Sequence, residues 1–179
     1  MLIILGIILL IIACAAAWYI GTSNRIKVAG LKISESLSGI DIALTKRYDV
    51  LTKMVDAVKS FQMYESDTFT KLVNIRMGMS MKERNDANRD MDKLVSELRV
   101  VAENYPELKS SENYAGLHKS IVDVEEHLQA ARRLYNANVT EYNRFIATFP
   151  SSIVAGSMGA SKKQYFEAES YKREDVKII

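Results

Sequence analysis

The first 20 residues constrain this chain more than any other stretch, because they carry no charged side chain and almost no polar one. An α-helix rises about 1.5 Å per residue, so about 20 such residues cross a hydrocarbon core about 30 Å thick. A helix also satisfies its own backbone hydrogen bonds, as lipid requires. Residues 1–21 are therefore predicted to form a transmembrane helix, and the rest of the chain a domain tethered to it.

Three other interpretations of this run stay open. A cleaved secretory signal would begin with basic residues and end at small ones; the basic start is missing, although Ala13 and Ala15 are small enough for a peptidase. A lipoprotein anchor at Cys14 would follow a lipobox, which the preceding Ile-Ile-Ala only faintly resembles. A core helix can also be apolar all round, but an uninterrupted N-terminal run of this length favours the membrane.

The charges that flank the run predict its orientation. No side-chain cation precedes it, whereas Arg25, Lys27 and Lys32 follow it closely. Cytoplasmic flanks collect Lys and Arg, so the short N-terminus is expected outside and the large domain in the cytoplasm. Each cation near an anionic leaflet adds about 1 kcal/mol of attraction. Trp18 and Tyr19 are expected at the cytoplasmic membrane interface, which amphipathic aromatic rings prefer.

Composition limits what the remaining chain can be. Removing the first 21 of the 179 residues leaves 158, enough for one domain with a core. A net charge of only +2 argues against nucleic acid as a partner. The single cysteine, Cys14, lies in the apolar run, so no intrachain disulfide can form and a reducing compartment is suitable. The chain contains only two prolines and eight glycines, the residues that most disfavour helix, so its composition favours helices.

Apolar residues after the run recur mostly at intervals of three, four or seven, which indicates one face of a helix. They are Ile26, Ile33, Leu37, Ile40, Leu44, Leu51, Val55 and Val58. Ser66 and Asp67 are N-cap candidates for a new helix, and a loop is expected over Met77–Arg84. The next helix is expected to open at Asp86 and to end near Tyr105, because Pro106 disfavours helical angles in the residue before it.

The clearest helix is predicted to begin after Ser111, a good N-cap, and to end at Pro150. Its apolar positions are spaced by three or four throughout: Tyr114, Leu117, Ile121, Val124, Leu128, Ala131, Tyr135, Val139, Tyr142, Ile146 and Phe149. The predicted fold is all-α, an N-terminal single transmembrane helix followed by a long antiparallel helical bundle with coiled-coil-like seams over residues 22–150. A short helix and a charged C-terminal tail are expected over residues 151–179.

Several distinctive motifs are spaced along the chain: Ile40-Asp41-Ile42-Ala43-Leu44-Thr45-Lys46-Arg47-Tyr48-Asp49, Tyr105-Pro106-Glu107-Leu108-Lys109, Arg132-Arg133-Leu134-Tyr135-Asn136, Tyr142-Asn143, Phe149-Pro150-Ser151 and Tyr165-Phe166-Glu167. Together they resemble the signatures of the LemA family of bacterial membrane proteins. The resemblance implies a single-span anchor in the bacterial inner membrane with a cytoplasmic helical bundle. A magnetosome-forming protein is a relative, which implies a role in organising membrane. The chain departs from the family pattern at Ser36-Leu37, where an Ala-Trp pair is common, and at Thr52-Lys53, where Pro-Asn is usual.

No motif predicts catalysis, a metal or a cofactor. A di-iron bundle would need Glu-x-x-His motifs, but Ala115 and Val124 stand three residues before His118 and His127. Residues 156–162 superficially resemble a phosphate loop, yet Ser161 precedes Lys162 where glycine is required. No Ser-His-acid or Cys-His set is suggested. The chain is therefore predicted not to be an enzyme.

One group of polar residues falls near the apolar seams: Asp41, Arg47, Asp49, Arg76, Glu125, Arg132, Asn136 and Asn143. Polar residues in such positions usually pair with one another and fix helix register. The alternative is a recognition patch for another protein. An enzyme would need a polar cleft around Arg132 and Asn136.

Two functional hypotheses follow. The first is a membrane-anchored, non-enzymatic scaffold that self-associates as a homo-oligomer and organises proteins or the cytoplasmic leaflet. The second is an adaptor or sensor for a membrane protease or signalling protein in envelope maintenance. The expected partners are the lipid bilayer, further copies of the chain and a membrane protein.

Overall fold

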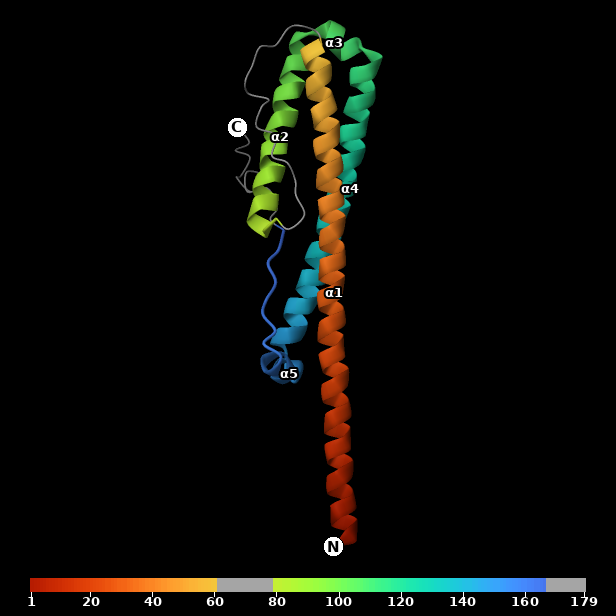
Figure 1. Ribbon diagram of the computed structural model, residues 1–179, viewed down its shortest axis with the longest axis vertical. Helices are drawn as coiled ribbons and strands as arrows, with labels where there is room; N and C mark the ends of the chain where they lie inside the picture. The colour runs from red at the N-terminus through yellow and green to blue at the C-terminus, as the bar shows by residue number, and fades with distance from the viewer. Residues whose placement is uncertain (61–78, 167–179) are drawn as a thin grey trace, which may run out of the picture. The chain divides into compact units, whose positions relative to one another are not determined.

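The computed structural model describes residues 1–60 and 79–166, and all regular secondary structure within these ranges is helical. The helices are α1 (Leu2–Ser60), α2 (Met81–Asn104), α3 (Pro106–Ser110), α4 (Glu112–Ala147) and α5 (Ser151–Ser157), as Figure 1 shows. The predicted all-α class, with a long apolar helix first, is confirmed. The helix expected after Ser66 and Asp67 lies outside the described residues.

The chain divides into two compact units, and both α1 and α4 contribute to each. We call Met1–Ser36 with Leu134–Tyr165 the N-terminal unit, and Leu37–Arg133 with Phe166–Ile179 the central unit. The boundary falls within helices rather than in a loop, since α1 and α4 continue through it.

In the central unit, α1 and α2 run parallel (Figure 1). Asp41 pairs with Arg84, and Arg47, farther along α1, pairs with Asp92, farther along α2. Residues 61–78, which separate α1 from α2 along the chain, lie outside the described residues. The antiparallel arrangement holds for α4.

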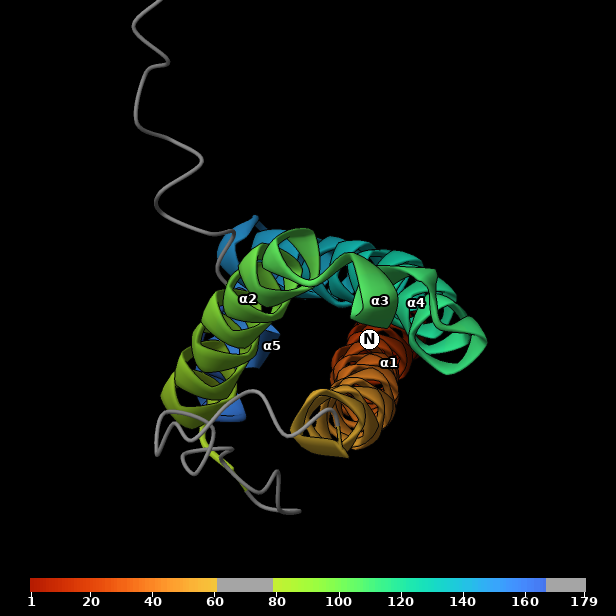
Figure 2. The same ribbon diagram turned by 90° about the horizontal axis from the view of Figure 1, so that it is seen from above.

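The return of α4 follows from the short helix α3. Pro106 opens α3 at its first position, where a missing N–H costs nothing, and the corner is seen end-on in Figure 2. Ser111 then caps α4, since its hydroxyl accepts a hydrogen bond from the Tyr114 backbone N–H at 3.2 Å. The Tyr114 hydroxyl donates to the Leu98 carbonyl at 3.2 Å, which joins α4 to α2. The predicted Ser111 cap and the end of α2 near Tyr105 are confirmed.

The start of α2 differs from the prediction. The helix begins at Met81, not at Asp86, because Ser80 forms a capping box with Glu83. The Ser80 N–H donates to Glu83 at 2.6 Å, and the Glu83 N–H donates to the Ser80 hydroxyl at 3.3 Å. Hydrogen bonds to the Glu83 carboxyl from the Ser80 backbone N–H and, to a smaller extent, from the Ser80 hydroxyl lower its pKa below the usual 4.5. The loop expected through Arg84 therefore gives way to helix from Met81 onward.

Both apolar seams form core, with few exceptions. In α1 every predicted seam residue is buried except Leu37, which is half-buried. In α4 the seam is buried at most positions, and Leu117 and Ala131 are half-buried. Phe149 is the clear error, because α4 ends at Ala147 and the Phe149 side chain is 81% exposed.

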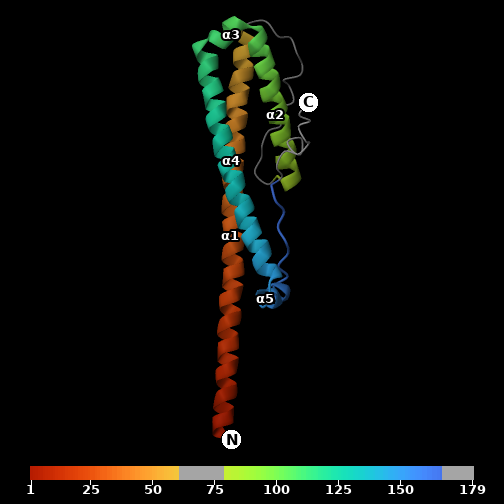
Figure 3. The ribbon, with the colours of Figure 1, turned by 180° about the vertical axis from the view of Figure 1, so that it is seen from behind.

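In the N-terminal unit, α4 runs antiparallel to α1, as seen from behind in Figure 3. The Asn138 amide donates to the Ser36 hydroxyl at 3.2 Å, and the Arg25 guanidinium lies 4.5 Å from the centre of the Phe145 ring. Ser36, where the family pattern commonly has Ala, thus supplies a contact between helices. Gly159 follows α5 with a φ of 65°, a left-handed conformation that favours glycine.

The apolar start of α1 has no packing partner within the described residues. Residues 1–21 are all exposed, and burial begins at Thr22 and Ile26. Among the described helices, α1 is the one that is long and apolar enough to cross a membrane, and no residue of its most apolar window is buried. Such a run of exposed side chains fits a lipid environment better than water.

Candidate functional site

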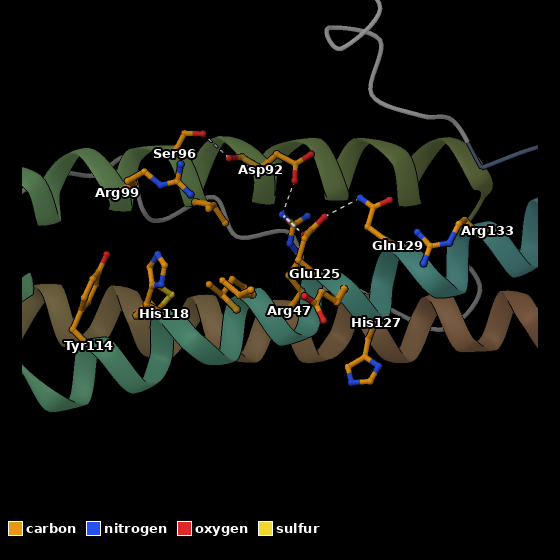
Figure 4. Close-up of a pocket in the computed structure, with 15 residues that line it drawn as sticks. Arg47, Asp92, Ser96, Arg99, Tyr114, His118, Glu125, His127, Gln129 and Arg133 are labelled. Carbon is orange, nitrogen blue, oxygen red and sulfur yellow. Dashed lines mark hydrogen bonds and ion pairs between the residues drawn. The ribbon is translucent and has the colours of Figure 1, made fainter.

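The central unit contains a groove of about 890 Å³ between α2 and α4, with α1 behind it (Figure 4). Arg47 and Met54 come from α1, while α2 contributes a short stretch that includes Asp92 and Arg99. The α4 residues that line it are Tyr114, His118, Ile121, Val122, Glu125, Glu126, His127, Gln129 and Arg133. The groove therefore mixes cations, carboxylates and apolar side chains.

Arg47 joins three helices near the middle of this groove (Figure 4), and its side chain is only 4% exposed. One guanidinium nitrogen, Nη2, lies 2.5 Å from the Asp92 carboxylate and 3.0 Å from that of Glu125. The other, Nη1, donates to the Asn88 side-chain oxygen at 2.8 Å. The dashed lines in Figure 4 show Arg47, Asp92 and Glu125 converging. We call Arg47, Asn88, Asp92 and Glu125 the Arg47 cluster.

Secondary hydrogen bonds hold the acids of the cluster in place. The Asn88 amide donates to Asp92 at 3.2 Å, and the Gln129 amide donates to Glu125 at 3.1 Å. The contact of Glu125 with Arg47 is an ion pair without hydrogen-bond geometry, whereas Asp92 accepts a hydrogen bond from Arg47. The charges of Arg47, Asp92 and Glu125 therefore pair with one another within the protein, as expected for residues that fix helix register.

A second ion pair lies one to two turns toward the start of the same helices. Arg84 donates to both carboxylate oxygens of Asp41, at 2.6 and 2.8 Å. Arg84 also donates to the Met79 carbonyl, immediately before the Ser80 cap. A bidentate pair of this kind is geometrically specific, so it aligns the start of α2 with α1.

The structure brings together some of the predicted polar residues and separates others. Arg47 and Glu125 meet directly, while Asp41 meets Arg84 instead. Arg132 is buried, with its guanidinium 4.9 Å from the centre of the Phe166 ring. Asp49 is exposed on α1, and Arg76 lies outside the described residues.

The two predicted asparagines belong to the N-terminal unit. The Asn143 side chain makes two hydrogen bonds with the backbone of Lys163: it donates to the carbonyl at 2.9 Å and accepts from the N–H at 2.8 Å. Asn136 is half-buried on α4, and its carbonyl accepts a hydrogen bond from Thr140. Both are placed to support the fold, and neither lines the groove.

The prediction missed Arg84, Asn88 and Asp92, the partners on α2. They are spaced by four residues, so they lie on one face of a helix that also carries apolar side chains. The predicted helix started at Asp86, so Arg84 fell in the predicted loop and was not recognised as part of this helix face. The capping box at Ser80 was the sequence pattern that could have revealed it.

The predicted membrane-interface residues lie on the exposed part of α1. Trp18 is 43% exposed and Tyr19 is 42% exposed. Lys27 and Lys32 are exposed, whereas the guanidinium of Arg25 stacks on Phe145. The assignment of these five residues to a membrane interface stays a prediction.

Among the described residues that line the groove, the titratable side chains other than arginine are one tyrosine, two histidines and three carboxylates. Burial raises the pKa of the Tyr114 hydroxyl, partly offset by Arg99, so this group stays protonated and serves as a donor to Leu98. His118 and His127 both line the groove, and the His127 side chain points away from α2 in Figure 4. Within the residues that the structure describes, no group of His, Cys, Asp and Glu could hold a metal ion.

Over residues 1–60 and 79–166, the fold and the site together define an all-helical protein with one candidate membrane-spanning helix and internal ion pairs between helices. The sequence model of the LemA family matches residues 36–179. The chain therefore belongs to the LemA family, as the motifs in its sequence indicated.

Relatives with curated names agree with this assignment. The protein LemA of Metamycoplasma hominis is 28% identical over 163 residues, which cover 88% of this chain and 74% of that relative. Magnetosome protein MamQ of Magnetospirillum gryphiswaldense is 30% identical over 69 residues, 38% of this chain and 25% of the relative. Magnetosome protein MamQ 2 of Paramagnetospirillum magneticum is 31% identical over 70 residues, 39% and 26% of the two chains.

Proposed function

We propose that this chain is a non-enzymatic, membrane-anchored scaffold, which self-associates and works through contact rather than catalysis. Its first helix spans the inner membrane of a bacterium once, with the N-terminus outside and the helical units in the cytoplasm. The observation that carries the anchor is the unburied apolar part of α1, since the chain supplies no cover for it among the described residues.

The absence of catalysis is inferred from how the charges are used. The acids nearest to the buried guanidinium are held by Arg47, Asn88 and Gln129, which leaves them poorly placed to act as bases. Among the described residues that line it, the groove contains no nucleophile beside a base, and the one serine, Ser96, donates to the Asp92 carbonyl. A binding surface is the simpler use of such a groove.

Self-association is supported by anchoring and by exposed apolar side chains. Copies that share a membrane are held in one plane and one orientation, which raises their effective concentration. In the central unit, Ile42 is 59% exposed, Val100 57% and Val122 46%. Val122 also lines the groove, so the groove is the proposed contact surface. Two relatives are named for the magnetosome, which supports a role at a membrane.

Subunit counting in lipid nanodiscs or after cross-linking in intact membranes tests the scaffold. Val122→Lys places a charge on the groove wall, whereas Asp123→Lys introduces the same side chain at the neighbouring exposed residue, which is not a lining residue. We expect oligomers for the unchanged chain and for Asp123→Lys, and fewer for Val122→Lys. If only monomers are trapped, self-association is wrong.

The alternative is an adaptor for a membrane protease or signalling protein, and the mixed charge of the groove favours it. Arg99 and Arg133 line the groove with exposed side chains, beside the exposed Glu126. A partner helix carrying both signs of charge would complement such a surface. Co-purification from membranes distinguishes the two: a stoichiometric heterologous partner supports the adaptor, and homo-oligomers alone support the scaffold.

A further inference from the structure

The corner between α4 and α5 exposes large apolar side chains that no other described residue covers. Phe149, just before α5, is 81% exposed, although it continues the buried spacing of α4. Ile153 in α5 is 61% exposed, while its neighbours Val154 and Ala155 are buried. The short helix therefore packs with one side and presents Ile153 on the other.

This corner lies beside the end of the apolar part of α1, within the N-terminal unit. The hydroxyls of Tyr19 and Ser157 are 3.0 Å apart and share a hydrogen bond. A cavity of about 480 Å³ is lined jointly by residues of α1 and of the corner: Trp18, Gly21, Thr22, Arg25, Phe145, Thr148, Phe149, Pro150 and Ser151. Phe149 is thus level with residues 18–25 of α1.

Residues 18–25 of α1 lie where the proposed transmembrane helix would meet the membrane interface. The apolar run ends at Ile20, and burial within the protein begins at Thr22. Beyond each face of the hydrocarbon core, the headgroup region is about 5–7 Å thick, which is about four residues of helix. Residues 21–25 of α1, and with them the α4–α5 corner, fall within this region if α1 spans as proposed.

The charge of the N-terminal unit complements an anionic leaflet. Its two acidic residues are Glu35 and Glu141, against six cations: Arg25, Lys27, Lys32, Arg144, Lys162 and Lys163. No acidic residue occurs between Glu141 and Phe166, the stretch that contains the corner. Anionic headgroups attract such a surface, and exposed aromatic and aliphatic side chains are favoured at the boundary below them.

We propose that the α4–α5 corner is a second membrane contact, in which Phe149 and Ile153 insert into the interface of the leaflet beside α1. This inference rests on the proposed membrane anchoring of α1. The bilayer is the occupant of this exposed surface, because the surface is continuous with the apolar helix and has the matching charge. The N-terminal unit is then held to the membrane at two points, so its tilt on the surface is fixed.

Site-directed fluorescence quenching tests the contact. In a Cys14→Ala background, a single cysteine replaces Ile153, Glu141 or Leu9 in the full chain and carries an environment-sensitive fluorophore. Glu141 is an exposed control on α4 in the same unit, and Leu9 reports on the span. The chains are placed in vesicles of phosphatidylethanolamine and phosphatidylglycerol, with iodide as the aqueous quencher and doxyl-labelled lipid as the membrane quencher.

The expected result is several-fold weaker iodide quenching at position 153 than at position 141, together with quenching by the doxyl lipid. Equal iodide quenching at both positions would overturn the second contact. So would protection at 153 without lipid quenching, because a second copy would then cover the corner. If position 9 also escapes lipid quenching, the anchor itself is wrong. If position 9 is quenched by lipid and 153 is not, this inference alone fails.

Discussion

At the scale of single residues, the buried guanidinium of Arg47 determines how the central unit is held together. A charge this buried is costly unless every nearby group is arranged around it, and here α2 and α4 each supply a carboxylate. Its Nε atom has no hydrogen-bond acceptor among the described residues, so the two terminal nitrogens carry the whole interaction. The stability of the unit should therefore depend strongly on this one side chain.

Replacing the residue tests that dependence. Arg47→Ala leaves two acids facing each other without their cation, and we expect the free energy of unfolding to fall by about 3 kcal/mol. Arg89→Ala is the matched control, since its pair with Asp86 is exposed on α2 and should be worth less than about 1 kcal/mol. Urea unfolding of both variants in detergent micelles measures the difference. Equal losses would show that the Arg47 cluster is not structural.

A double-mutant cycle divides the cluster between its two acids. Asp92 is 13% exposed and 2.5 Å from Arg47, whereas Glu125 is 34% exposed and 3.0 Å away. Water screens the more exposed pair, so the coupling of Arg47 with Asp92 should exceed its coupling with Glu125. Alanine variants of the three residues, singly and in pairs, provide both couplings. A larger coupling with Glu125 would contradict the geometry.

At the scale of helices, the sequence predicted the faces whose apolar residues recur at a regular spacing, and it missed features that leave no such spacing. The seam from Ile26 to Val58 was predictable because burial every third or fourth residue leaves a regular pattern. The end of α2 was predictable from Pro106. Phe149 was misplaced because its spacing continues a pattern whose helix has already ended at Ala147. Spacing alone does not reveal that the surface there faces away from the core.

The start of α2 is stabilised by the capping box of Ser80 and Glu83, and the carboxyl group of Glu83 can be titrated. The folded pKa of Glu83 lies below 4.5, so its stabilising effect is complete above that pH and is lost as the pH falls through the lower folded value. Ser80→Ala removes the hydroxyl but keeps the backbone N–H, and it should raise the pKa of Glu83 partway toward 4.5. The lost cap should also cost about 1 kcal/mol.

Carbon-detected NMR of the Glu83 carboxyl group, followed through an acid titration, measures this pKa in both chains. Ser120→Ala is the control, because Ser120 lies in the middle of α4 and its hydroxyl donates to the Gly116 carbonyl. It should leave the Glu83 pKa unchanged. A Glu83 pKa of 4.5 in the unchanged chain would show that the capping box is not formed.

The α4 seam makes a sharper prediction with two adjacent residues. Leu128 is completely buried, so Leu128→Glu places an unpaired carboxylate in the core and should cost several kcal/mol. His127→Glu introduces the same side chain one residue earlier, at an exposed position, and should change stability little. Thermal unfolding followed by circular dichroism compares them. If Leu128→Glu keeps the melting temperature of the parent, the seam assignment is wrong.

At the scale of the whole molecule, the sequence identified the candidate site only in part, for a physical reason. Arg47 and Glu125 were recognisable as polar residues near apolar seams, but their meeting depends on where α2 lies. The parallel direction of α2 brings Asn88 and Asp92 to Arg47, and no periodicity within one helix encodes the direction of its neighbour. Pairing between helices is a tertiary property, and it determines which α2 residues join the Arg47 cluster.

The arrangement of charge along the chain predicts how the molecule is oriented. Arg25, Lys27 and Lys32 follow the apolar run, and cations near a span are retained on the cytoplasmic side. A reporter fused after Ile179 that fluoresces only in the cytoplasm should therefore fluoresce in bacteria that express the chain. Changing the three cations to Glu and adding three lysines before the apolar run should shift a large fraction of molecules to the opposite orientation, with loss of fluorescence and gain of a periplasmic phosphatase signal. The same lysines added between Ile179 and the reporter, far from the span along the chain, provide the control and should change neither reporter. A periplasmic signal from the unmodified chain would reverse the proposed topology and would place both the groove and the α4–α5 corner on the outer side of the membrane.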